Sequence, residues 1–168
     1  MSRGSDFPEN FHQSASNSIR NLMLVNQEEA IDRYISAQKN VRIARNGGSN
    51  RLVVVEGKGA DSLERGDAVS FYYAGYIFSN GKGSLFATNN PEVASKSEFP
   101  LSGGVESALI GDGSLIPGLE KGLAGAKAGE VCQIVFSAKY GYDNESVYNV
   151  PKMSPLIFDV WVESIGKN

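Results

Sequence analysis

The sequence predicts an α+β fold, in which a twisted antiparallel sheet forms a half-barrel around one short helix and follows an N-terminal helical extension. Three observations indicate this fold. Stretches that are β-branched or that alternate apolar and polar residues dominate the chain from Arg51 onward. Asn80 and Gly81 separate two of these stretches and form a strong hairpin-turn signal. In this half of the chain, helical periodicity is confined to the stretch around Pro117.

The chain divides into an N-terminal arm and helix at residues 1–49 and a sheet domain at residues 50–168. Residues 1 to about 25 are polar and mixed, so we expect a partly ordered arm there. Asn26 is a plausible N-cap, with Glu29 at the third position of the helix that follows.

This first helix is expected near residues 27–38, and its apolar side chains share one face, which indicates that it docks onto the domain. The apolar residues of that face are Ala30, Ile31, Tyr34 and Ile35. The segment ARNGGSN at residues 44–50 breaks the helical pattern and predicts a loop.

Five later stretches have the composition and alternation of β-strands. They cover residues 51–57, 67–78, 83–90, 130–138 and 155–165. The second helix is expected near residues 117–124, because Pro117 suits a first helical position, where its missing N–H costs nothing. Its apolar face would face the sheet, and Gly125 can end it.

Composition narrows the classes of function. The net charge of −3 gives no electrostatic reason to expect a nucleic-acid partner. A single Cys132 and a single His12 exclude an internal disulfide and clusters of cysteine or histidine ligands, so we expect neither a metal nor a cofactor. No stretch approaches the roughly 20 apolar residues of a membrane span. No signal peptide is visible, although the first residues could replace a removed leader.

The segment AKYGYDNESVYNVP, residues 138–151, combines turn residues with three tyrosines. Tyr140, Tyr142 and Tyr148 could plug the rim of the core, or they could line a pocket that needs flat apolar walls with a hydroxyl at the tip. The residues of this segment alone leave both readings open.

Four segments together resemble the FKBP-type peptidyl-prolyl isomerases, the macrolide-binding immunophilins. They are GKGADSLERGDAVSFYYAGYIF, LIPGLEKGLAGAKAGE, FSAKYGY and PLIFDVWVESI, and they occur in the order and spacing of that family. The resemblance covers roughly residues 51–165. The N-terminal part is similar to the extension of envelope-targeted bacterial members, which implies the bacterial periplasm or cell envelope.

The resemblance implies cis-trans isomerisation of X–Pro bonds in peptides or unfolded proteins, and a role in protein folding. Its catalytic positions match Tyr142, Phe86 and Phe158 in this sequence. Its other pocket positions match Tyr73, Phe99, Leu115, Ile116, Leu119, Tyr148 and Val150. It also implies that proline-containing peptides and a macrolide are ligands, while the oligomeric state and the substrate stay open.

Departures from the family pattern favour weak catalysis. The aspartate that follows Phe86 in the family is Ala87 here, and the tryptophan at the pocket floor is Leu119. A second phenylalanine that precedes the family's helix is also replaced, near Ser97. An alternative is therefore a binding module that holds proline peptides without turnover. A third alternative is a structural domain whose interaction surface lies on the N-terminal arm.

Overall fold

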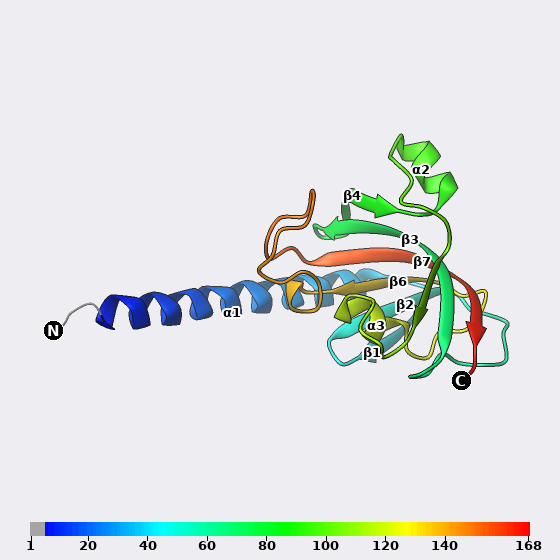
Figure 1. The fold of residues 1–168 in the computed structure, drawn as a ribbon, viewed down its shortest axis with the longest axis horizontal. Coiled ribbons are helices and arrows are strands. Elements are labelled where there is room, and N and C mark those ends of the chain that lie inside the picture. Colours follow the sequence, from blue (N-terminus) through cyan, green and yellow to red (C-terminus); the bar gives the residue numbers. More distant parts are fainter. Residues whose placement is uncertain (1–5) are drawn as a thin grey trace.

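The computed structural model describes residues 6–168, and describes side chains from residue 15 onward. Its body is a 7-stranded antiparallel sheet with strand order β1-β2-β6-β7-β3-β4, and β5 pairs with β3 (Figure 1). The elements are α1 (Asp6–Ala37), β1 (Arg42–Asn46), β2 (Ser49–Val55), β3 (Ala68–Phe78), β4 (Lys82–Thr88), α2 (Pro91–Ser97), β5 (Glu106–Leu109), α3 (Pro117–Leu123), β6 (Val131–Phe136), the short 3-10 helix η1 (Ala138–Tyr140) and β7 (Leu156–Gly166). The predicted α+β fold, with its antiparallel sheet and N-terminal helix, is confirmed.

The two faces of the sheet are covered by different helices. The even-numbered residues of β7 from 156 to 162 are buried in one core together with Leu123 of α3. Ile157 points to the opposite face, where it packs with Ile31 and Ile35 of α1. This division follows from the two-residue period of a strand, which sends successive side chains to opposite faces. The expected docking of the first helix onto the domain is therefore observed.

The first helix is much longer than the sequence predicts. The chain is helical from Asp6 to Ala37, so the expectation of a partly ordered arm before residue 25 is wrong for the part that the structure describes. Residues 1–5 of the expected arm lie outside the described residues. Asn26 lies inside the helix and does not cap it. Pro8 falls in the first turn, where proline is tolerated, and no glycine or proline follows it before Gly47.

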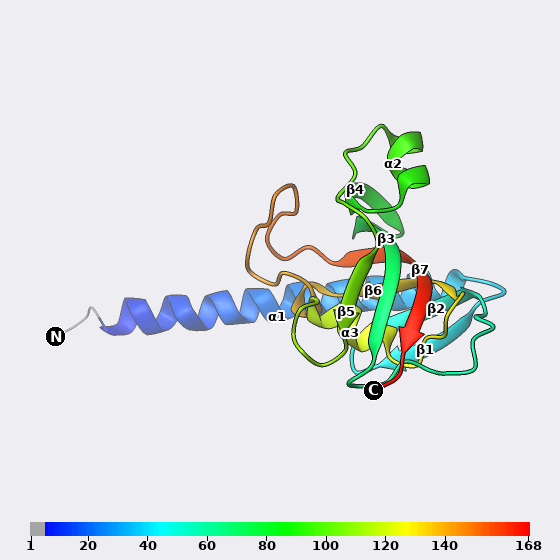
Figure 2. The same ribbon diagram turned by 45° about the vertical axis from the view of Figure 1, so that its right-hand side comes forward.

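Tertiary contacts hold the middle of α1 against the domain. Leu24 is buried with Ala138 and Met153 in a small cluster of its own. The part of α1 before this contact projects beyond the sheet, as Figure 2 also shows. Contacts with residues more than a hundred positions away stabilise the middle of the helix, so local sequence patterns do not reveal how far it extends.

The segment that the sequence predicts as a loop is a tight β-hairpin. Arg42 pairs with Val53 and Asn46 with Ser49, and Gly47 and Gly48 have φ of 58° and 98° at the turn between them. Positive φ at both central residues is the geometry of a type I′ turn, which glycine adopts without strain. The sheet therefore begins at Arg42. The division of the chain at residues 49 and 50 stays a prediction.

The segment between β4 and β5 carries α2 away from the body of the sheet, and both ribbon views show this helix standing off at one end (Figures 1 and 2). Asn90 caps α2, because its side chain accepts hydrogen bonds from the N–H groups of Glu92 and Val93. Glu98 closes the helix with a left-handed φ of 50°. The chain then returns to pair β5 with the first half of β3.

Candidate binding site

A pocket of about 180 Å³ opens between α3 and the inner face of the sheet. Most of its wall is aromatic or aliphatic. Its lining residues are Phe71, Tyr73, Phe86, Ala87, Glu106, Ser114, Ile116, Leu119, Tyr142 and Phe158. The pocket thus brings together, from β3, β4, α3, β7 and the loop after η1, the expected residues Tyr73, Phe86, Ile116, Leu119, Tyr142 and Phe158.

Phe158 is the centre of the aromatic wall. Its ring centroid lies 5.7 Å from that of Phe86 in an edge-to-face arrangement. It lies 6.2 Å from the ring of Tyr73 and 6.0 Å from that of Phe136, which stacks behind it. Aromatic pairs at such distances stabilise one another beyond their buried area. The wall is therefore held in shape before a ligand arrives.

The absence of a side chain at Gly75 makes this packing possible. A Cβ at this position would lie 2.7 Å from the ring of Phe158 and 2.8 Å from the ring of Phe86. Ala87 is the partner of Gly75 on the neighbouring strand β4. The two rings thus pack against a strip of the sheet that carries only small residues.

Tyr142 contributes a hydroxyl to the pocket. It follows η1 in the chain and is half-buried, and burial, with a smaller contribution from Tyr73, raises its pKa. Its phenol therefore keeps its proton at neutral pH. Within the described part of the chain, no hydrogen bond occupies this hydroxyl. It is available to donate to a ligand in the pocket. Of the two interpretations of the loop tyrosines, lining a pocket therefore applies to Tyr142.

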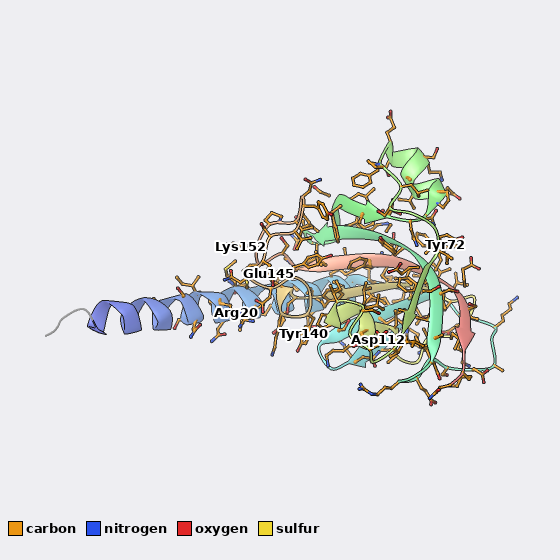
Figure 3. The ribbon with its side chains drawn as sticks, viewed as in Figure 1. Arg20, Tyr72, Asp112, Tyr140, Glu145 and Lys152 are labelled. Carbon is orange, nitrogen blue, oxygen red and sulfur yellow. The ribbon has the colours of Figure 1, made fainter. Side chains whose placement is uncertain are left out.

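The loop that carries Tyr142 is tied to α1. Gln27 of α1 donates to the carbonyl of Met153 at 2.7 Å, and its side-chain oxygen accepts from the N–H of Ala138 at 2.9 Å. Arg20 reaches the same loop from the preceding turns of the helix (Figure 3). The N-terminal helix therefore supports one wall of the pocket, although it does not line it.

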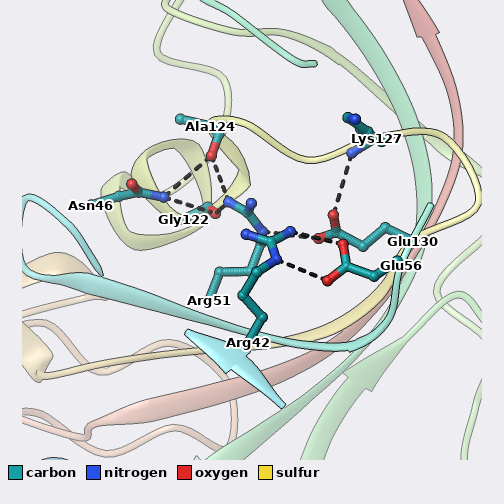
Figure 4. Close-up of polar contacts among 8 residues, drawn as sticks. All are labelled: Arg42, Asn46, Arg51, Glu56, Gly122, Ala124, Lys127 and Glu130. Carbon is teal, nitrogen blue, oxygen red and sulfur yellow. Dashed lines mark hydrogen bonds and ion pairs between the residues drawn. The ribbon is translucent and has the colours of Figure 1, made fainter. Parts of the chain in front are cut away.

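A buried ion pair holds the C-terminal end of α3. Nε of Arg51 lies 2.9 Å from Oε2 of Glu130, and both side chains are about fully buried, at 2% and 1% exposure. The two atoms lack the alignment of a hydrogen bond, so their attraction is mainly coulombic. Nη1 of Arg51 donates to the carbonyl oxygens of Gly122 at 3.0 Å and Ala124 at 2.5 Å, at the end of α3 (Figure 4). A cation at this end is favourable for the helix dipole.

The structure leaves some expected residues outside the pocket lining, so their part in the site stays a prediction. Phe99 belongs to the turn that closes α2, where its N–H donates to the carbonyl of Ala94. Tyr148 is fully exposed at the tip of a tight turn with a φ of 48°. Val150 is buried in the core at 1% exposure, and Leu115 packs against the same core at its edge.

Sequence reasoning missed some residues of the lining. Phe71 appears in the sequence only as one of several alternating core residues, and Ser114 precedes the expected helix without a motif of its own. Glu106 lines the pocket from β5, where it pairs with Phe71 of β3. No motif in the sequence marks Glu106 as a pocket residue.

Asn89 fixes the strands that surround the pocket. Its side-chain oxygen accepts from the N–H of Tyr73 at 2.6 Å, and its Nδ2 donates to the carbonyls of Phe71 at 3.3 Å and Gly104 at 3.0 Å. The residue is 2% exposed. It therefore joins the end of β4, the middle of β3 and the approach to β5 by buried hydrogen bonds, which are costly to leave unmade.

Residues 6–168 contain no group of three or more His, Cys, Asp or Glu side chains placed to hold a metal ion, as far as those side chains are described. In the same part of the chain, no helix combines the length and the apolar character that a membrane crossing requires.

Comparisons with known proteins agree with this geometry. Residues 59–163 match the family of FKBP-type peptidyl-prolyl cis-trans isomerases. FK506-binding protein 1 of Aspergillus oryzae is 29% identical over 113 residues, which are 67% of this chain and 94% of the relative. The isomerase FkpA of Buchnera aphidicola is 28% identical over 130 residues, which are 77% of this chain but only 46% of the relative.

The crystal structure of FkpA from Escherichia coli has the same fold, with a TM-score of 0.62 at 21% identity, and the match covers 96% of this chain and 71% of that chain. The family match spans well over half of the sequence and contains every residue that lines the pocket. The chain therefore belongs to the family of FKBP-type peptidyl-prolyl cis-trans isomerases.

Proposed function

We propose that this protein catalyses cis-trans isomerisation of X–Pro bonds in peptides or unfolded protein segments. The observation that carries the proposal is the pocket of about 180 Å³ with aromatic walls and an unoccupied Tyr142 hydroxyl. Pockets for drug-sized ligands measure roughly 300–1,000 Å³. The smaller volume suits a single proline ring, with the rest of the peptide outside.

The chemistry requires no bond to break. Rotation about a prolyl amide has a barrier of about 18–20 kcal/mol because of resonance. Twisting the amide removes that resonance and makes its carbonyl less polar. The apolar surface of Phe86 and Phe158 favours the twisted amide over the planar one, because it offers the planar dipole little solvation. The hydroxyl of Tyr142 would donate to a substrate carbonyl and orient it.

We expect this catalysis to be weak. Ala87 lines the pocket at the position where the resemblance implies an aspartate. Its methyl group offers no charge that would polarise the site or hold the hydroxyl of Tyr73. The aromatic walls remain, so part of the preference for the twisted amide is kept.

Ala87 also favours a second candidate function, a module that binds proline peptides without useful turnover. Tyr142, Ile116 and Phe158 would serve both functions, since each lines the same pocket. Turnover and binding measured on the same peptide separate the two.

The setting of the activity is also a proposal. The likeness to FkpA of Buchnera aphidicola and of Escherichia coli supports a bacterial envelope protein that assists folding as a chaperone. The likeness to FK506-binding protein 1 supports a macrolide as a competing ligand of the pocket. A ligand of that size would extend well beyond the cavity.

The test is a protease-coupled prolyl-peptide assay, run beside a titration with FK506. The expected result is measurable acceleration of isomerisation that saturating FK506 suppresses. Tyr142→Phe should lower kcat/KM or peptide affinity. The loss should correspond to a binding free energy of about 0.5–1.5 kcal/mol, the contribution of one neutral hydrogen bond. Tyr72→Phe is the matched control, because Tyr72 is the neighbour of Tyr73 on β3 and does not line the pocket.

Peptide binding without acceleration would favour the binding module. A protein that neither binds nor isomerises prolyl peptides would contradict both functions. A Tyr142→Phe variant that behaves as the wild type would remove this hydroxyl from the site.

A further inference from the structure

The pocket contains a carboxylate that the proposed isomerisation does not use. Glu106 lines the pocket from β5, among residues that are otherwise aromatic, aliphatic or uncharged. Its side chain is exposed, and none of the ion pairs within the described part of the chain includes it. A carboxylate in this position meets any peptide that enters the pocket.

The position of Glu106 is fixed by the backbone around it. It forms a strand pair with Phe71, and the carbonyl of Gly104, two residues earlier, accepts a hydrogen bond of 3.0 Å from buried Asn89. The start of β5 is thereby attached to β3 beside the aromatic wall. The carboxylate is held at the pocket by the sheet and does not depend on a flexible loop.

A second acidic group lies in the adjoining cavity. A groove of about 690 Å³ follows the other side of β5, and Ser114 lines both this groove and the pocket. Asp112 lines the groove, and its carboxylate accepts a hydrogen bond of 2.9 Å from the N–H of Ser114.

The lining of the two cavities includes no lysine or arginine. Arg65 lies close to Gly111, next to Asp112, but lines neither cavity. The path available to a peptide from pocket to groove is therefore acidic.

We propose that Glu106 is a specificity-determining residue that selects substrates with a lysine or arginine next to the proline, with Asp112 extending the preference into the groove. This inference rests on the proposed function, since it assumes that the proline occupies the pocket. A basic neighbour would pair with the carboxylate at the pocket, and an acidic neighbour would be repelled. Because the pair is exposed, a preference of about two- to fivefold is expected.

The experiment uses the full chain and acyl-Ala-X-Pro-Phe para-nitroanilide peptides in which X is Lys, Leu or Glu, with a second series that places the charge after the proline. The measured quantity is the ratio of kcat/KM, or of Kd if turnover is absent, between the Lys and Glu peptides. The wild type should prefer Lys by about two- to fivefold in at least one series. Raising the salt concentration should reduce the preference.

Variants assign the preference to its source. Glu106→Gln should bring the ratio close to one, Glu106→Lys should invert it, and Asp112→Asn should reduce it partly. Glu163→Gln is the matched control, because Glu163 is exposed on β7 outside both cavities and its loss should not change the ratio.

The outcomes separate this inference from the proposed function. In one outcome, the Leu peptide is bound or turned over while the ratio between the Lys and Glu peptides is the same in the wild type and in Glu106→Gln. That result would overturn the role of Glu106 and leave the proposed function in place. An equal fall of the ratio in Glu163→Gln would also overturn it, because the effect would then come from overall charge. Failure to bind or turn over any of the peptides would overturn the proposed function and this inference with it.

Discussion

Arg20 in the N-terminal helix and Asp143 in the loop that carries Tyr142 form a bidentate ion pair, although they lie 123 positions apart in the sequence. Nε of Arg20 donates to one carboxylate oxygen at 3.0 Å, and Nη2 donates to the other at 2.8 Å. Both side chains are partly exposed. Asp143 is the residue directly after Tyr142 and has a left-handed φ of 51°, so the pair holds the backbone that presents the tyrosine.

Removing this pair should loosen the loop that carries Tyr142. We expect Arg20→Gln to raise KM for a prolyl peptide more than it lowers kcat, because the hydroxyl of Tyr142 would be less well placed to bind. Amide hydrogen exchange should become faster at residues 141–150 and stay unchanged in β6 and β7. Arg33→Gln on the same helix is the control, because Arg33 forms none of the ion pairs within the described part of the chain. Unchanged exchange in the loop would contradict this role.

Gly75 should be sensitive to the smallest side chain. Gly75→Ala would press a methyl group into the rings of Phe158 and Phe86, and such overpacking costs about 1–3 kcal/mol. We expect lower stability and a loss of peptide binding, because the rings must shift into the pocket. Gly104→Ala is the control, since its added Cβ would meet open space. Calorimetry and peptide titration measure both effects, and a Gly75→Ala variant with normal affinity would show that the rings can shift without closing the pocket.

The buried pair of Arg51 and Glu130 should be costly to break from one side. Glu130→Gln leaves the arginine charge buried without its partner, and such changes typically cost about 3–5 kcal/mol. Because Arg51 also caps the end of α3, Arg51→Met should destabilise the domain as well. Urea unfolding measures this cost. The exposed pair of Arg42 and Glu56 provides the comparison, and Glu56→Gln should cost much less than Glu130→Gln.

A loss of only 1 kcal/mol or less in Glu130→Gln would mean that the pair contributes no more than a surface pair. The double change Arg51→Met with Glu130→Leu adds a second test. If the two charges stabilise the fold mainly by attracting each other, the double variant should lose less free energy of unfolding than the two single variants lose in sum.

Some of this structure follows directly from local sequence. The alternation in residues 156–162 predicts the strand and its buried face, and Asn80-Gly81 predicts the β3–β4 hairpin. Pro117 predicts the start of α3. In these elements, the preference of the residues and the tertiary environment agree, so sequence alone is sufficient.

Other parts are decided by contacts far apart in the chain. The early turns of α1 are rich in serine and asparagine, which are weak helix formers. They are helical together with the later turns, which Leu24 and Arg20 attach to the loop at residues 141–153. The resemblance implies that Phe99 lines the pocket, but Phe99 lies in the turn that closes α2. The strand that borders the pocket at this point is β5, which begins at Glu106, because its pairing with β3 selects the register.

Asp67 should make folding stability depend on pH in the acid range. Lys167, the N–H of Asn168 and the N–H of Glu64 hydrogen-bond its carboxylate and lower its pKa to about 2. The unfolded value is about 3.9, so the folded state binds this proton less readily. Its contribution to stability is therefore complete above about pH 4 and is lost as the pH falls toward 2. Asp67→Asn should remove that part of the acid dependence.

The measurement is the urea midpoint of wild type and Asp67→Asn at several pH values between neutral and acid. The difference between the two proteins should shrink as the pH falls below about 4, because protonation of Asp67 removes its contribution in the wild type, whereas the other carboxylates titrate in both proteins and cancel. Asp61→Asn, an exposed neighbour, is the control. A difference that stays constant across the acid range would show that the charge of Asp67 is not the source of its contribution.

Ala87 offers the most direct test of the catalytic proposal. It lines the pocket, lies opposite Gly75 and follows Phe86, so Ala87→Asp would add a carboxylate beside the aromatic wall. A hydrogen bond to a charged group is worth about 1.5–3 kcal/mol, and each 1.36 kcal/mol is about tenfold in rate. If all of that energy acts on the twisted amide, kcat/KM should rise by about ten- to a hundredfold. Ala87→Asn controls for size and polarity without charge and should gain less.

A wild type that already turns over rapidly and an Ala87→Asp variant that changes nothing would together show that the carboxylate is dispensable here. No turnover in either protein, with saturable peptide binding in both, would instead favour the binding module.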